Sequence, residues 1–344
     1  MTGSLLRISR RAALARALAT GLCSALPALY READAASLPV IRKRIPSTGE
    51  LLPVIGIGTN SFRDAEYEEL RQILARMHAL GGRLIDTAAR YGESEGVIGR
   101  ALASLDLRKK MFVATKFNAP GVNLPFRRMG PPGGAPGRMA GGPGGRGFRG
   151  PPPDNVYGQA SFDRSLERLK TDHVDLLYAH FIPSVEPLMP LMRDLKSAGK
   201  TRYIGITTFL PQQHDMLTAL MRKYPIDFVQ VDYSIADRDA EKMVFPVAIE
   251  RRLAVVVDVP FGGRFGSVLA KTKDKPLPAW AADIGATSWS QFLLKYVISH
   301  PAVTCAIPGS TQLAHLIDNQ LAGHGVLPDA AMRKRMESYW DSIA

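Results

Sequence analysis

The stretch GRLIDTAARYG, residues 82–92, is the part of the sequence around which the rest of the chain is organised. Residues 83–85 form a short apolar run that predicts a strand, Asp86 stands where that strand ends, and Tyr91 follows in the next loop. In a parallel α/β protein, side chains at the carboxyl ends of strands face the ligand, so this acid and this phenol can converge on one pocket. The alternative is structural: Asp86 caps the next helix and Tyr91 packs on it.

The rest of the chain repeats this strand-to-helix unit. Apolar runs alternate with stretches of helical periodicity, and eight strands each followed by a helix make an α/β protein of the (β/α)8 TIM barrel class. Before the first unit, residues 41–53 alternate apolar and polar around a turn at 47–49, which predicts a β-hairpin. The predicted strands are 54–58, 83–86, 111–116, 174–180, 203–207, 228–232, 255–259 and 304–308, and the predicted helices are 66–80, 95–105, 159–169, 188–197, 212–223, 242–252, 288–299 and 312–321.

Charge and cysteine content disfavour two classes of protein. The 344 residues carry a formal net charge of +12, but residues 1–35 contribute +3 of it and residues 119–153 contribute +5. The remainder carries only +4, which disfavours a nucleic-acid partner. Of the two cysteines, Cys23 and Cys305, only the second would remain after removal of an N-terminal leader, so no internal disulfide framework is expected.

Residues 1–35 have the layout of a bacterial signal peptide of the twin-arginine type. The pair Arg10-Arg11 precedes a moderately apolar run of small residues, and residues 33–35 offer an Ala-x-Ala cleavage site. Arg16 interrupts the apolar run, so no stable membrane insertion is expected after processing. The sequence therefore predicts export to the periplasm and a mature domain at 36–344. The alternative is an amphipathic or disordered N-terminal arm on a cytoplasmic protein.

One segment, residues 119–153, interrupts the rhythm between the third strand and the third helix. It holds 11 Gly and 9 Pro without periodicity, which predicts a disordered Gly/Pro/Arg-rich insertion. It would emerge at the carboxyl ends of the strands, on the same face as Asp86. Two interpretations stay open: a neutral loop expansion, or a flexible lid or arginine-rich arm that contacts an acidic partner.

Four polar residues fall at or just past predicted strand ends: Asp86, Tyr91, Lys116 and His180. Singly, each is compatible with a structural role, but the strand ends of one barrel meet at one mouth. A nearby ammonium favours the phenolate form of a tyrosine and is expected to lower its pKa, while a carboxylate holds that ammonium in place. Such a tyrosine can donate a proton to a developing alkoxide, and a histidine beside it can orient a carbonyl oxygen.

The motifs that carry these residues resemble those of the aldo-keto reductases from about residue 41 to the C-terminus, outside the insertion. They are KRIPSTGELLPVIGIGT (43–59), LIDTAARYGESEGVIGRAL (84–102), FVATK (112–116), DLLYAH (175–180), GKTRYIGITTF (199–209), FVQVDYS (228–234) and IPGSTQLAHLIDNQ (307–320). The resemblance implies a barrel closed at its bottom by the hairpin, a nicotinamide cofactor bound without a Rossmann domain, and a catalytic tetrad. By motif, the tetrad is Asp86, Tyr91, Lys116 and His180, with Tyr91 as the general acid for hydride transfer to a carbonyl carbon.

The cofactor positions match the family pattern less closely. Thr207-Thr208 replace the Ser-Asn that usually holds the carboxamide, and Asp258 stands where a tyrosine often stacks on the nicotinamide. His315 stands where an arginine often meets the 2′-phosphate, so NADP(H) is the expected cofactor and NAD(H) stays an alternative. The residues that the resemblance assigns to cofactor binding are Thr59, Thr207, Thr208, Gln230, Pro260, Phe261, Gly262, Gly309, Ser310, Thr311, His315 and Asn319.

Three functions remain compatible with the sequence. The first is an exported NADP(H)-dependent reductase of a small carbonyl substrate, with its oligomeric state open. The second is a non-catalytic, cofactor-binding regulatory subunit on the same scaffold, to which the changes at Thr208 and Asp258 would correspond. The third is a binding module in which the 119–153 segment contacts the partner.

Overall fold

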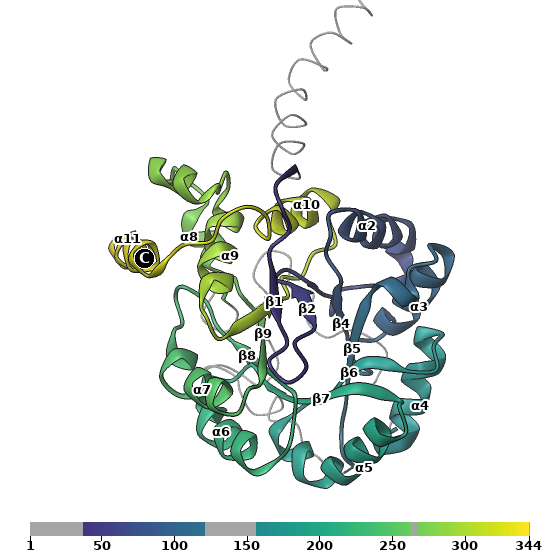
Figure 1. Cartoon of the computed structure of the whole chain (residues 1–344). Coiled ribbons are helices and arrows are strands. Elements are labelled where there is room, and N and C mark those ends of the chain that lie inside the picture. Colours follow the sequence, from purple (N-terminus) through teal and green to yellow (C-terminus); the bar gives the residue numbers. More distant parts are fainter. Residues whose placement is uncertain (1–36, 121–155, 263–266, 344) are drawn as a thin grey trace, which may run out of the picture. The chain divides into compact units, whose positions relative to one another are not determined.

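The computed structural model describes residues 37–120, 156–262 and 267–343, and its centre is a parallel eight-stranded sheet curled into a barrel (Figure 1). The strands pair in chain order, and bridges from Ile55 to Ala306 and from Gly58 to Gly309 join the first strand region to the last. The predicted (β/α)8 TIM barrel is confirmed. Its strands are β3 (Ile57–Gly58), β4 (Leu84–Asp86), β5 (Phe112–Phe117), β6 (Val174–Ala179), β7 (Thr201–Thr208), β8 (Phe228–Asp232), β9 (Ala254–Asp258) and β10 (Val303–Ala306).

The first strand is shorter than the five residues predicted for it. Val54 and Ile55 are buried as expected, but the amide of Val54 donates to the carbonyl of Ile41 and Ile55 forms only an isolated bridge to Ala306 of the last strand. The amide of Ala306 donates to the carbonyl of Val54 at 2.9 Å, and the amide of Gly56 donates to the carbonyl of Ala306 at 2.8 Å. These residues therefore close the barrel.

Helices follow the strands and surround the barrel (Figure 1). The helix α2 (Tyr67–Ala79) illustrates why they pack against the barrel, because one face of it is apolar. The apolar residues of that face recur at helical spacing and are buried in the core: Leu70, Ile73, Leu74 and Met77. The helices that match the prediction are α2 (Tyr67–Ala79), α3 (Ser94–Ser104), α4 (Gly158–Leu169), α5 (Val185–Ser197), α6 (His214–Lys223), α7 (Asp239–Glu250), α9 (Trp289–Ser299) and α10 (Leu313–Leu321). The prediction omitted α8 (Val268–Thr272) and α11 (Ala330–Ile343).

The predicted hairpin is present as β1 (Arg42–Arg44) and β2 (Leu51–Pro53), which pair antiparallel. Its turn contains Gly49 at φ +79°, a left-handed conformation that favours glycine. Ile45 and Leu52 are buried in the cluster that fills the barrel interior, so the hairpin closes this end. The ammonium of Lys43 adds hydrogen bonds of 2.7–2.8 Å to the carbonyls of residues 298, 300 and 303.

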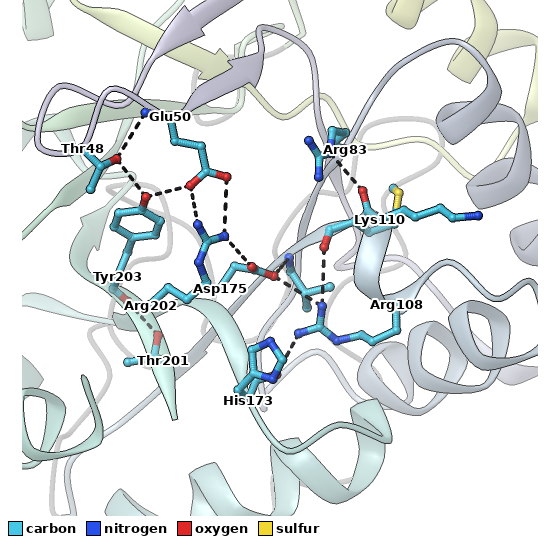
Figure 2. Close-up of polar contacts among 12 residues, drawn as sticks. Thr48, Glu50, Arg83, Arg108, Lys110, His173, Asp175, Thr201, Arg202 and Tyr203 are labelled. Atoms are coloured by element: carbon cyan, nitrogen blue, oxygen red, sulfur yellow. Dashed lines mark hydrogen bonds and ion pairs between the residues drawn. The ribbon is translucent and has the colours of Figure 1, made fainter. Parts of the chain in front are cut away.

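A polar network fastens the hairpin to the starts of β6 and β7 at this bottom end (Figure 2). Arg202 donates to Glu50 and, at 2.9 Å, to Asp175, and the hydroxyl of Tyr203 donates to Glu50 at 2.8 Å. Asp175 also accepts from the backbone amide of Val113 at 2.8 Å. These hydrogen bonds and ion pairs therefore connect the hairpin with β5, β6 and β7, which are far apart in the sequence.

The inner face of the barrel changes from apolar to polar toward the carboxyl ends of the strands. In β5, Phe112 and Ala114 belong to the interior apolar cluster, and Lys116 follows on the same face because side chains alternate along a strand. In β8, Phe228 belongs to that cluster and Gln230 follows. The apolar half fills the barrel, and the polar half forms a mouth at the opposite end from the hairpin.

Some sequence predictions fall outside the described residues. These are the signal peptide at 1–35 and all of the 119–153 insertion except Ala119 and Pro120. Within the described ranges, no helix is long and apolar enough to cross a membrane, and no cluster of His, Cys, Asp and Glu side chains could hold a metal ion.

Candidate active site

The mouth contains a buried ion pair between the ends of β4 and β5. Asp86 is 3% exposed and Lys116 is 1% exposed. Lys116 donates to a carboxylate oxygen of Asp86 and, at 3.0 Å, to the backbone carbonyl of Thr87. The second carboxylate oxygen of Asp86 accepts from the amide of Gln230 at 3.0 Å, which in turn accepts from Thr207 at 3.0 Å. The pair is therefore held in one orientation by the sheet.

Tyr91 lies in the loop after β4, with its half-buried ring 5.1 Å from the ammonium of Lys116. Burial raises the pKa of this phenol above its ordinary value, and it outweighs the opposite effect of Lys116. The sequence argument, in which the ammonium lowers the tyrosine pKa, has the correct sign for Lys116 but omits the larger cost of desolvation. The phenol is therefore protonated at neutral pH, as a proton donor must be.

His180 follows β6 and meets Tyr91 edge to face, with ring centroids 5.7 Å apart. It stacks on Phe181 at 4.4 Å, and its Nδ1 is buried without a hydrogen-bond partner in the described chain. Burial, together with the positive charges of Lys116 and Arg90, holds the pKa of His180 well below its ordinary value. The imidazole is therefore neutral at pH 7, with one ring nitrogen protonated and the other free to accept.

Two carboxyl groups lie side by side at the ends of β8 and β9. Asp232 and Asp258 are register partners, so their side chains lie on the same face of the sheet. Asp232 pairs with Nε2 of His214 at 3.1 Å, whereas Oδ1 of Asp258 is buried without a partner in the described chain. Burial and the neighbouring Asp232 raise the pKa of Asp258 well above its ordinary value, although Lys116 lowers it.

A sequence model described as the aldo/keto reductase family matches residues 54–339. The chain belongs to this family.

Relatives and solved structures agree with this assignment. The aryl-alcohol dehydrogenase of Pestalotiopsis microspora is 32% identical over 214 residues, which cover 60% of this chain and 50% of that protein. An aldo-keto reductase of Bacillus subtilis is 28% identical over 52% of this chain and 47% of its own length. The chain thus spans about half the length of the curated relatives it matches.

The solved structures share the fold at lower identity. An aldo-keto reductase from Bacillus halodurans in its holo form has a TM-score of 0.64 and 21% identity, over 87% of this chain and 96% of that one. One from Klebsiella pneumoniae in complex with NADPH has a TM-score of 0.61 and 20% identity, over 88% of this chain and 96% of that one.

Among the positions that the aldo-keto reductase resemblance assigns to the cofactor, the threonines are already engaged. Thr59 donates to the carbonyl of Asp86 at 2.9 Å and accepts from Ser94 at 2.8 Å. Thr207 faces the barrel interior, where it bonds Gln230, but Thr208 points to the other side of β7 and donates to Gln213 at 2.6 Å. Thr207 and Gln230 therefore join the Asp86 cluster, and Thr208 does not.

The remaining assigned positions lie in the loops after β9 and β10. The first loop begins with Val259 at φ +40°, a strained conformation for a β-branched residue, and continues through Pro260 to Gly262. Phe261 is half-buried, Pro260 is buried, and Gly262 also has a positive φ of +73°. After β10, Gly309 and His315 are exposed, Ser310 and Thr311 are half-buried, and Asn319 is buried.

The sequence interpretation missed three polar residues at the mouth. Tyr178 lies beneath Lys116, with its ring centroid 5.8 Å from the ammonium and its hydroxyl unpaired among the described residues. Asp232 and His214 form the pair described above. The alternation of strand side chains could have found two of them, because Tyr178 stands two residues before His180 and Asp232 two after Gln230.

Proposed function

We propose that this protein is an NADP(H)-dependent reductase that converts an aldehyde or ketone to an alcohol, with Tyr91 as the general acid. The observation that supports this proposal best is the arrangement of Tyr91 and His180 over the buried Asp86–Lys116 pair. A purely structural role would not need a charged pair at 3% and 1% exposure beneath a phenol that is hydrogen-bonded to its ammonium.

The residues after β10 fit the phosphates of such a cofactor. Gln312, at the start of α10, makes no side-chain cap, so the first-turn amides are available to an anion. His315 lies exposed on the same turn, where a cation would meet a 2′-phosphate. The Klebsiella pneumoniae reductase that shares the fold was solved with NADPH, which supports NADP(H) here; NAD(H) is the alternative cofactor.

In the proposed reaction, the cofactor and the side chains at the mouth have separate roles. When bound, NADP(H) supplies the hydride. Tyr91 gives its hydroxyl proton to the carbonyl oxygen as charge develops there, and Lys116 stabilises the phenolate that remains. Asp86 holds Lys116 in position. A neutral His180 donates one hydrogen bond to the carbonyl oxygen and so orients it without delivering a second proton.

The test is turnover of a simple aryl aldehyde with NADPH by wild type and Tyr91→Phe. The variant should lose about 10²- to 10⁴-fold in kcat, the usual contribution of a general acid, while NADPH binding measured by fluorescence stays close to wild type. Tyr224→Phe, which changes an α6 terminus remote from the mouth, is the control and should be active. A Tyr91→Phe variant within about threefold of wild type would overturn the assignment of Tyr91.

One observation favours a second candidate, the non-catalytic cofactor-binding subunit. Thr208 points away from the mouth and Asp258 places a carboxyl group there, so two expected cofactor contacts are missing. Cofactor binding without turnover of any aldehyde in a panel would favour this candidate over the enzyme.

We also propose that residues 1–35 direct export by the twin-arginine route, with the cytoplasm as the alternative location. The support is the Arg10-Arg11 pair and the Ala-x-Ala site in the sequence. Changing both arginines to lysine should keep the precursor in the cytoplasm. An unchanged periplasmic yield would contradict the proposal.

A further inference from the structure

A second polar hollow lies beside the mouth, between the loop after β4, the end of β5 and the start of α4. It is lined by Arg90, Asn118, Tyr157, Ser161, Arg164 and Arg168, among others. The lining includes three arginines and no carboxylate. Its electrostatic character is therefore positive.

Arg90 is the unusual member of this group. Its guanidinium is half-buried, and within the described ranges it has neither a hydrogen bond nor an ion pair. Arg168, by contrast, is paired with the buried Glu95 at 3.5 Å. Burial lowers the pKa of Arg90 although Tyr157 raises it, so the charge is held in a partly dehydrated place without a counter-ion among the described residues.

Asn118 gives an independent indication. It is 5% exposed, and its Oδ1 is buried without a hydrogen-bond partner in the described part of the chain. A buried amide oxygen without a partner is uncommon and calls for a missing partner. With either orientation of the amide, a polar group entering the hollow would find a donor or an acceptor.

The hollow adjoins the proposed reaction centre. Arg90 directly precedes Tyr91, and its charge is close enough to lower the pKa of His180. One small molecule could therefore reach both Arg90 and the proton donor Tyr91.

We propose that Arg90 and Asn118 form a carboxylate subsite, and that the substrates of this protein are carbonyl compounds that carry a carboxylate. This inference rests on the proposed function and specifies its substrate class. Arg90 binds the carboxylate through its planar fork of donors, and the side-chain NH2 of Asn118, turned toward the hollow, donates a further hydrogen bond to it. The proposed phosphate contacts of the cofactor lie after β10, on different elements.

The experiment compares carboxybenzaldehydes with their methyl esters, which keep the carbonyl and nearly the same shape but remove the charge. The ortho, meta and para isomers sample different separations between aldehyde and carboxylate. The measured quantity is the ratio of kcat/KM for acid over ester, in wild type, Arg90→Met and Arg90→Lys. The wild-type ratio should be highest for one isomer, and Arg90→Met should lower it about tenfold or more, mainly through KM of the acid.

Arg90→Lys keeps the charge without the fork and should give an intermediate ratio. The matched control is Arg63→Met, because Arg63 is a half-buried arginine of the loop after β3 and donates to the backbone carbonyls of Asn60 and Phe62. Arg63→Met should leave the acid-over-ester ratio unchanged. An equal fall of the ratio in Arg63→Met and Arg90→Met would mean that positive charge around the mouth attracts acids in general, and it would overturn a specific site at Arg90. Asn118→Ala should also lower the ratio, by a smaller factor.

The outcomes separate the two proposals. Absence of turnover for every aldehyde and ester would overturn the proposed function. Turnover of esters and acids with equal efficiency, unaffected by Arg90→Met, would overturn the carboxylate subsite alone. Benzoate carries the carboxylate without a reducible carbonyl, so its binding tests the subsite alone. It should compete with the acids in wild type, and its affinity should fall at least about tenfold in Arg90→Met. If inorganic phosphate competes equally with acids and esters, and benzoate does not compete, the hollow takes free anions only.

Discussion

At the bottom of the barrel, the carboxylate of Asp175 accepts hydrogen bonds from Arg202, Arg108 and the amide of Val113. At the mouth, the carboxyl oxygen Oδ1 of Asp258 is just as inaccessible and has no partner in the described chain. The carboxyl group of an aspartate is thus fully hydrogen-bonded at the bottom, whereas an aspartate at the mouth keeps one carboxyl oxygen without a hydrogen bond.

The contrast extends beyond these two aspartates. The buried side-chain atoms without partners in residues 37–120, 156–262 and 267–343 belong to Asn118, Tyr178, His180 and Asp258, which lie at the mouth or directly beneath it. The network around Glu50 and Arg202 at the bottom contributes none of them. Unsatisfied groups cost stability, so their concentration at one end indicates that this end is shaped for a ligand and the other for holding the fold.

The largest effect is expected at the bottom, for Asp175→Asn. The amide cannot accept from two guanidinium groups and a backbone amide as the carboxylate does, and it places its own donors against them. Because both arginines are partly exposed, the loss is about 1.5 to 3 kcal/mol in the free energy of unfolding, measured by urea titration. Arg222→Met removes an exposed pair with Glu250 and should cost less than about 1 kcal/mol. Equal losses in the two variants would remove the distinction between the bottom network and an ordinary surface pair.

The second effect concerns packing between the two ends. Gly205 lies opposite Tyr178, and a Cβ there would come within 2.6 Å of the tyrosine ring and 2.8 Å of the carbonyl of Phe228. Gly205→Ala should therefore lower the free energy of unfolding by about 1 to 3 kcal/mol, the cost of overpacking. Gly96→Ala is the control with the opposite sign, because a Cβ at Gly96 meets nothing within 4 Å and alanine favours the helix. A neutral Gly205→Ala would show that both the Tyr178 ring and the backbone at Phe228 can shift at little cost.

The sequence predicted the fold more completely than it predicted the hydrogen bonding of the candidate site. The eight strands follow from apolar runs such as 228–232, which the structure reproduces without change. The helix α11 was missed because only Arg333, Met336 and Trp340 are buried, which leaves a weak apolar stripe in a charged segment.

For the site, the motifs nominated Asp86, Tyr91, Lys116 and His180, and the structure brings these four together, with their roles still a proposal. Whether a polar atom is paired depends on distances between segments that are remote in sequence. The isolation of Arg90 and the unused hydroxyl of Tyr178 therefore could not be inferred from residue types.

The third prediction uses pH to test the raised pKa of Asp258 at the mouth. Because burial and Asp232 raise the folded-state pKa of Asp258 above its unfolded value, the folded state holds a proton that the unfolded state has already lost. This group stabilises the fold below the unfolded pKa, and that contribution is lost as pH rises through the folded pKa. Asp258→Asn cannot ionise, so it should gain stability relative to wild type as pH is raised from mildly acidic to alkaline. A constant difference in unfolding free energy across that range would show that Asp258 is ionised and paired in the folded protein.

The smallest effect, and the cleanest comparison of the two ends, is expected from removing one hydroxyl at each. Tyr178→Phe deletes a buried hydroxyl that has no partner in the described chain, so its desolvation penalty disappears with it. The free energy of unfolding should stay within about 0.5 kcal/mol of wild type or rise slightly. Tyr203→Phe deletes a hydroxyl that donates to Glu50 and lies 2.9 Å from the hydroxyl of Thr48, and it should cost about 0.5 to 1.5 kcal/mol. Both rings stay in the same interior cluster, so the apolar contribution is matched and the difference reports the hydrogen bonds alone. A loss of 1 kcal/mol or more for Tyr178→Phe would mean that a bound water satisfies this hydroxyl beneath Lys116, and that the mouth is less unsatisfied than its side chains indicate.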